Sequence, residues 1–455
     1  MTATEIAPDV ETPAPDPPPR RTPWWWRLLR ATVPPLVALA AGWALLASRS
    51  GVSGGSFLRP SLWGRWDSGH YLAIARIGYN INWNCRPSMV PPHAPPGHYL
   101  CGNAGWFPGY PAAMRLVSDV AGISIPVAAL VVSWACWYLV LALMWRLLAD
   151  ARSLPARWVC LLIAAFFPGQ VYFATIFPIS LTVAAMLACL YAATRASRPW
   201  LGAGVGFLAG FVAAYSYITA AVLAPALLVT AFLAVRGRRR VQALLPALGV
   251  VAGFGAVLLT MRFAVGLWNA YFLSAAKYGV GAHSPLDTLR NRLSPLWTEQ
   301  PPGLEFRDTT ASQTLLALCL VTLATLVTLG RAASRPARAV PAEEPASAAG
   351  PIDRAEPAAP ADTQPRRPSP YARWYPAFTA RLSAFDLTFL LAAVGVWLVP
   401  YVAGGQASTY RSEAFVILTV PLLRRLPAWM LVVPLGAVVL VAWHMAPYFF
   451  NAKLA

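Results

Sequence analysis

Charge is scarce in this sequence of 455 residues. Only 12% of the residues are charged, about half the share found in soluble globular domains, whereas 57% are hydrophobic. The mean hydropathy is +0.52. This combination excludes an ordinary soluble protein and predicts a chain that crosses a lipid bilayer many times. Because backbone polar groups must be satisfied within the hydrocarbon, we expect an all-α polytopic membrane protein.

Acidic residues are the rarer charged type, with 18 against 36 basic residues. Nine of the 18 lie in two Pro-rich segments, four in residues 1–21 and five in residues 331–384. The basic excess could indicate nucleic acid, but the arginines cluster between apolar runs rather than forming one stripe among aromatic residues. No nucleic-acid partner is therefore expected, and an acid elsewhere in the chain calls for an explanation.

Several signatures of other protein classes are also missing. The sequence has no P-loop and no G-x-G-x-x-G after a strand, so no nucleotide-binding motif is visible. No internal repeat of fixed period is visible. We expect no cleavable signal peptide, because the first apolar run follows a long Pro- and acid-containing tail. No cofactor is expected, and a requirement for a divalent metal stays open.

Long apolar runs dominate what is present. A bilayer core requires about 20 apolar residues per helix. On this scale the sequence predicts about eleven transmembrane helices, at residues 32–48, 125–149, 156–175, 179–194, 200–215, 218–235, 241–265, 313–330, 385–401, 413–423 and 428–449. We predict a disordered tail at 1–31, a transmembrane module at 32–330, a disordered linker at 331–384 and C-terminal transmembrane helices at 385–455.

Arginine placement predicts the sidedness of these helices. Compact clusters fall in alternate loops, at residues 152–157, 195–198, 236–240 and 424–425. The positive-inside rule places these loops, the N-terminus and both disordered segments in the cytoplasm. The loops at 49–124 and 266–312 then lie on the outer face, and we expect amphipathic helices within the first of them.

An acid in the first outer loop has two interpretations. Asp67 lies in the first turn of a possible helix and three residues before His70, among aromatic residues. A carboxylate there could simply cap the helix, and residue type alone leaves the cap and a functional role equally plausible. An acid at the membrane boundary is costly without a partner or a role, which favours function.

Four segments carry a resemblance to a known family. Arg65-Trp66-Asp67 with His70-Tyr71-Leu72 and Gly78-Tyr79 resembles the opening motif of PIG-V-type mannosyltransferases. Shorter resemblances follow in the same order along the chain, at residues 106–111, 167–173 and 410–423. The resemblance implies a GT-C glycosyltransferase, a multi-span enzyme that takes a sugar from a polyprenyl phosphate on the non-cytoplasmic face. It also implies that Asp67 is the general base.

The chemistry of such a transfer agrees with the residues present. An acceptor hydroxyl must lose its proton as it attacks the anomeric carbon, and one carboxylate suffices for inversion. The leaving lipid phosphate requires cations or hydrogen-bond donors. We take His70 as a second catalytic candidate, which could equally assist the phosphate or hydrogen-bond Asp67. The candidates for binding substrate or phosphate are Arg65, Tyr71, Arg76, Lys277, Tyr410 and Arg411.

Arg411 is the strongest cation candidate, because it lies among hydroxyl residues at the mouth of a late span. The alternatives are an ion pair with Glu413 or an arginine that reaches the interface. Two departures from the family pattern bear on which substrate the protein uses. Relatives carry an acid near the position of Ile179 and an arginine near the position of Ser216. Mannose is the first choice of sugar, a pentose is possible, and the two missing charges could alter or abolish activity.

Composition and resemblance suggest the setting. The Ala-, Arg- and Pro-rich sequence is typical of high-GC bacteria, which predicts the bacterial plasma membrane and an acceptor that is a cell-envelope glycolipid, glycan or protein. A transporter or flippase of lipid-linked sugars is the alternative from another class, although few ionisable residues fall within the spans. A catalytically inactive scaffold is the third possibility.

Two of the six cysteines lie outside the apolar runs. Cys85 and Cys101 share the first outer loop, where an oxidising compartment favours a disulfide between them. A zinc site with His93 and His98 is the alternative, but the spacing matches no standard finger, and we predict no metal site. The other four, Cys136, Cys160, Cys189 and Cys319, are expected to be small core residues.

Overall fold

The computed structural model describes residues 23–81, 102–235, 237–276, 280–334, 382–404 and 409–451. Every regular element in these ranges is a helix. This confirms the all-α polytopic membrane fold. The tail at 1–22, the linker at 335–381, Cys85, Cys101 and Lys277 lie outside the described residues, so the predicted disulfide and both disordered segments stay predictions there.

Seven helices of the described residues are long and apolar enough to cross a membrane. They are α1 (Trp24–Arg49), α5 (Ile125–Leu147), α9 (Pro199–Ser216), α11 (Arg238–Val265), α14 (Phe306–Ser334), α16 (Ala384–Ala403) and α19 (Ala428–Phe450). Helix α1 begins at Trp24, so residues 24–31 are helical and do not belong to the predicted tail. Trp24 is 76% exposed, as expected of an aromatic anchor at an interface.

The other four predicted spans correspond to shorter apolar helices. They are α6 (Leu154–Ala165), α8 (Ile179–Arg195), η3 (Ile218–Val222) continuing into α10 (Leu223–Leu233), and η5 (Glu413–Thr419) continuing into α18 (Val420–Leu423). The predicted helix at 156–175 is wrong beyond Ala165, because Pro168 and Gly169, with φ +83°, interrupt it before α7 (Val171–Ala174). Tyr172 and Phe177 in this irregular segment are buried, so protein rather than lipid surrounds its backbone.

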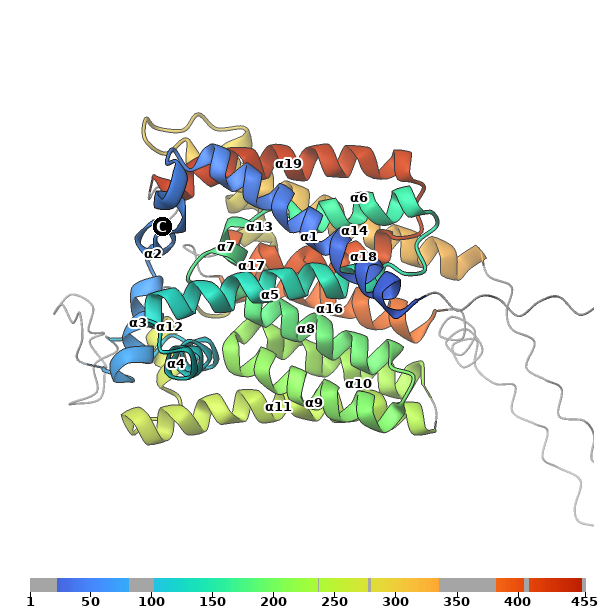
Figure 1. Ribbon diagram of the computed structural model, residues 1–455, viewed down its shortest axis with the longest axis horizontal. Coiled ribbons are helices and arrows are strands. Elements are labelled where there is room, and N and C mark those ends of the chain that lie inside the picture. The colour runs from blue at the N-terminus through green and yellow to red at the C-terminus, as the bar shows by residue number, and fades with distance from the viewer. Residues whose placement is uncertain are drawn as a thin grey trace, which may run out of the picture.

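The helices run roughly alongside one another in a bundle (Figure 1). Helix α9 packs against α8 and α11. At Gly249 and Gly253 of α11, an added Cβ would collide with the backbone carbonyl of Phe207 or Phe211 on α9. Small residues of this kind let membrane helices approach closely and gain packing contacts.

Short helices gather at one end of the bundle, near α3, α4 and α12 in Figure 1. The predicted first outer loop contributes η1 (Gly54–Leu58), α2 (Pro60–Trp63), α3 (Ser68–Ile77) and α4 (Gly109–Ala121). The second contributes α12 (Ala270–Ala276), α13 (Pro285–Leu293) and η4 (Ser294–Leu296). Helix α4 buries Tyr110 and Met114 and exposes Arg115 and Asp119, which confirms an amphipathic helix in this loop.

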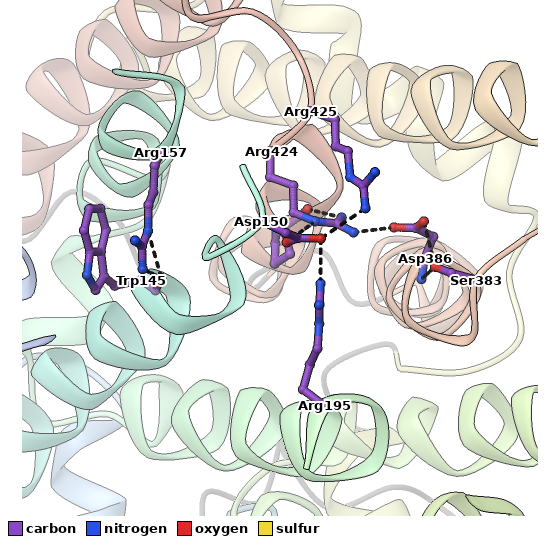
Figure 2. Close-up of polar contacts among 9 residues, drawn as sticks. Trp145, Asp150, Arg157, Arg195, Ser383, Asp386, Arg424 and Arg425 are labelled. Atoms are coloured by element: carbon purple, nitrogen blue, oxygen red, sulfur yellow. Dashed lines mark hydrogen bonds and ion pairs between the residues drawn. The ribbon is translucent and has the colours of Figure 1, made fainter. Parts of the chain in front are cut away.

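The opposite end of the bundle brings several arginines together around two acids (Figure 2). Asp150, in the turn after α5, accepts hydrogen bonds from Arg195 at 2.9 Å, Arg424 at 2.9 Å and Arg425 at 3.1 Å. Arg424 is 1% exposed and also donates to Asp386 at 2.9 Å. Arginines that the sequence places in separate loops thus form one ion-pair cluster at a single end, called here the Arg-rich end.

Acid should weaken the Arg-rich end. Burial alone would raise the pKa of Asp150, but the hydrogen bond from Arg195 and the charge of Arg424 outweigh it and lower this pKa from 3.8 to about 2. Because the pKa is lower in the folded state, the contribution of Asp150 to stability is complete above about pH 4 and is lost as the pH falls toward about 2. We expect the melting-temperature difference between wild type and Asp150→Asn in detergent to shrink across that window. A difference that stays constant on acidification would contradict this prediction.

Candidate active site

A tight turn presents Asp67 at the beginning of α3. Trp66 before it has φ +44°, and it is the one non-glycine residue with positive φ in the described ranges. Such a conformation is disfavoured for a bulky residue and persists where the surrounding structure requires it. Trp66 packs edge-to-face on Phe449 of α19, at 5.3 Å between ring centroids. The turn is thereby anchored to the last transmembrane helix.

The Asp67 side chain pairs with Arg411. It forms no capping hydrogen bond to α3, although Asp67 is the N-cap residue, so the helix-cap interpretation is wrong. Its Oδ2 instead accepts a hydrogen bond from Nη1 of Arg411, on α17 (Thr409–Ser412). The Asp67 side chain is 32% exposed and that of Arg411 is 5% exposed. A water-accessible carboxylate therefore meets a nearly buried guanidinium.

Aromatic rings surround the Arg411 guanidinium. Its Cζ lies 5.0 Å from the ring centroid of Phe177, 5.8 Å from that of Tyr172 and 5.9 Å from that of Trp66. Cation–π attraction from these faces compensates part of the cost of burial. The irregular segment after α6, which broke the predicted helix, supplies two of the three rings.

Glu413 lies two residues further along and does not take the role that the sequence suggested for it. Its Oε1 accepts hydrogen bonds from Thr314 of α14 at 2.7 Å and Tyr401 of α16 at 2.8 Å. The residue is 2% exposed. These bonds hold the segment that carries Arg411 against two transmembrane helices. The alternative in which Arg411 pairs with Glu413 is therefore wrong, and Arg411 pairs with Asp67 instead.

A cavity of about 630 Å³ opens beside the Asp67–Arg411 pair. These two residues are the charged groups that line it among the described residues. Seven aromatic side chains make up much of the remaining wall: Trp66, Tyr71, Trp106, Phe107, Tyr217, Tyr271 and Phe272. The volume suits a small-molecule ligand, and a mostly apolar wall with a few polar groups is typical of such sites.

Residues from distant parts of the chain enclose this cavity. Pro400 and Ala403 at the end of α16 line one side, and Gly281 of the second outer loop lies beside them. The backbone N–H groups of Gly281 and His283 donate to the carbonyls of Ala403 and Val402, at 2.8 and 2.9 Å. Both predicted outer loops therefore contribute to one site.

Two further candidates from the first outer loop lie at or near the cavity. Burial first, and then the charges of Tyr217 and Asp67, raise the pKa of Tyr71 well above 10, so its hydroxyl stays protonated. The His70 ring stacks on the indole of Trp106, with centroids 3.5 Å apart and planes at 10°. Trp106 lines the cavity, and His70 does not. His70 is placed to orient an aromatic wall.

The remaining cation candidates lie elsewhere. Arg65 donates from Nη2 to the backbone carbonyl of Phe450 at 3.2 Å, which ties the turn to the end of α19. Arg76 is exposed on α3 and does not line the cavity. The side chain of Tyr410 lies outside the described residues. Of the predicted binding residues whose side chains are described, Arg411 is the one cation that lines the cavity, and Tyr71 lines it as well.

Some features of the site escaped sequence analysis. Tyr401 and Thr314 were assigned only to apolar spans, although a hydroxyl near the end of each span was the available signal. Ile179 and Ser216, where relatives of the resembled family carry charges, are both buried, and neither lines the cavity. Among the cysteines assigned to the core, Cys160 and Cys189 are buried, Cys136 is partly buried and Cys319 is exposed on α14.

Comparison with known proteins adds no relative. No protein-family model matches the chain, and no curated protein matches it. The PIG-V-like resemblance therefore rests on the four short sequence segments alone.

Proposed function

We propose that this protein is an inverting glycosyltransferase that moves a sugar from a polyprenyl phosphate to a cell-envelope acceptor. The observation that carries the proposal is the aromatic cavity with one carboxylate and one guanidinium, positioned by the turn at Trp66 and by α17. Aromatic faces stack on sugar rings, and an arginine beside them suits a phosphate. Mannose is the first choice of sugar because of the resemblance to PIG-V-type enzymes.

The proposed reaction uses Asp67 as general base. The carboxylate takes the proton of an acceptor hydroxyl while the hydroxyl oxygen forms a bond to the anomeric carbon. The bond between that carbon and the phosphate oxygen breaks on the opposite face, and the polyprenyl phosphate leaves with both bonding electrons. Arg411 stabilises the charge that develops on the phosphate. One carboxylate at the cavity favours inversion, since retaining glycosidases use two carboxyl groups about 5 Å apart.

The proposed orientation follows from charge. The Arg-rich end would face the cytoplasm, and the cavity at the other end would face outward, where a lipid-linked donor does not compete with cytoplasmic nucleotide sugars. In this arrangement the protein lies in the bacterial plasma membrane. The transmembrane helices around the cavity would accommodate the polyprenyl chain.

A transfer assay tests the function. Membranes that contain the wild-type chain should transfer radiolabelled mannose from polyprenyl-phospho-mannose to endogenous envelope acceptors, and membranes without the chain should not. Transfer only from a different lipid-linked sugar would reject mannose and keep the reaction class. No transfer from any lipid-linked sugar, together with movement of the intact donor across the bilayer, would favour the flippase alternative.

A further inference from the structure

The two charged groups of the cavity neutralise each other. Of the described residues that line it, Asp67 is the one anion and Arg411 the one cation, and they share a direct ion pair. A carboxylate whose oxygen accepts a hydrogen bond from a guanidinium is less available to the hydroxyl of an acceptor than a released carboxylate. A guanidinium held by a carboxylate is likewise less available to another anion.

The surroundings of the pair are unequal. Arg411 is nearly buried among the rings of Trp66, Tyr172 and Phe177, and the Glu413 hydrogen bonds fix the following segment. Asp67 lies in a turn, and its side chain is about one-third exposed toward the cavity. An anion that enters the cavity therefore reaches Arg411, which is held in place. Asp67 is the more accessible residue of the ion pair and the more easily displaced one.

We infer that the Asp67–Arg411 ion pair is a latch that the donor phosphate opens. The phosphate replaces Asp67 on Arg411, and the displaced carboxylate becomes free to accept the proton of the acceptor hydroxyl. The base is thereby released only when the donor is in place. This inference rests on the proposed function, because it gives Asp67 and Arg411 their roles in the same reaction.

The latch has a thermodynamic consequence that does not depend on turnover. If phosphate and Asp67 compete for Arg411, removing the charge of Asp67 must strengthen phosphate binding. Couplings between interacting sites are typically about 5- to 150-fold in affinity. The effect must also disappear when Arg411 is absent, because no shared partner then connects the two anions.

Binding of farnesyl phosphate to the purified full chain in detergent tests the latch. We expect Asp67→Asn, which keeps the shape and removes the charge, to bind at least about fivefold more tightly than wild type. The same substitution should have no effect in an Arg411→Gln background. Farnesol and inorganic phosphate, measured separately, distinguish binding of the chain from binding of the phosphate.

Matched controls come from α4, where Asp119 and Arg115 are exposed and do not line the cavity. Asp119→Asn and Arg115→Gln should bind farnesyl phosphate as wild type does. Should Asp67→Asn fail to fold, Asp67→Ser makes the same measurement with a smaller neutral side chain. Equal gains in Asp119→Asn and Asp67→Asn would overturn the latch, since a general change in surface charge would then explain both.

The outcomes distinguish failure of the latch from failure of the proposed transferase function. Equal or weaker binding by Asp67→Asn overturns the latch, while Arg411-dependent binding and sugar transfer by wild type would keep the proposed function. Tighter binding by Asp67→Asn, together with no transfer by wild type from any lipid-linked sugar, would keep the competition for Arg411 and reject the transferase. If neither wild type nor Asp67→Asn binds farnesyl phosphate, the latch and the phosphate site are both overturned.

Discussion

Replacing Asp67 with asparagine should lower the rate of sugar transfer at least about a hundredfold, because general-base catalysis contributes roughly 10²- to 10⁴-fold. The substitution keeps a hydrogen-bond acceptor near Arg411 and removes the proton acceptor. If Asp67 acts as base, the loss should lie in kcat, with KM for the donor unchanged or lowered. Initial rates with polyprenyl-phospho-mannose, normalised to the amount of folded protein, measure both constants.

The control for this prediction is Asp119→Asn on α4, an exposed acid at the same end of the bundle that does not line the cavity. It should transfer sugar as wild type does. Transfer by Asp67→Asn at the wild-type rate would reject the general-base assignment. A loss confined to KM would also reject it, and would indicate that Asp67 serves donor binding instead.

Arg424 should be essential for stability rather than for chemistry. Its side chain is 1% exposed and connects Asp150 to Asp386 at the Arg-rich end (Figure 2). Removing one member of a buried ion pair leaves an uncompensated charge and costs about 3–5 kcal/mol. We expect Arg424→Gln to lower the melting temperature in detergent and the yield of monodisperse protein more than any single surface substitution.

Two variants sharpen this prediction. Arg198→Gln removes an exposed arginine near the same end, and it should leave the melting temperature within error of wild type. Arg424→Met combined with Asp386→Leu removes both buried partners and should recover part of the loss, because Asp150 keeps Arg195 and Arg425. A melting temperature of Arg424→Gln equal to that of Arg198→Gln would show that the cluster contributes little.

Sequence analysis located most spans within a few residues. Helices α5, α16 and α19 begin and end close to the predicted limits, since uninterrupted apolar runs bounded by charged, proline or glycine residues leave little choice of register. The predicted helix at 156–175 was wrong beyond Ala165, because the apolar content continues past the break at Pro168 with Tyr172 and Phe173. Composition reports the burial of these rings but not the course of the backbone that carries them.

The two predicted outer loops show the same division. Asp67 was singled out because acids are scarce, and in the structure it lines a cavity. The partner of Asp67 could not be predicted, because Arg411 lies 344 residues away along the chain. Glu413, two residues from Arg411, was the obvious alternative partner for that arginine. Tertiary packing decided between the two when Thr314 and Tyr401 supplied Glu413 with hydrogen bonds.

The scarcity of charge determined by itself that this protein is a helical membrane protein, because apolar runs of this length are stable only in lipid or in a protein core. It also determined which few acids required an explanation. Only the tertiary structure decided how the remaining charges pair, since a desolvated charge takes the partner that packing brings within reach, whatever their separation along the chain. Asp67 thereby meets Arg411 at one end of the bundle, and Asp150 and Asp386 meet Arg424 at the other.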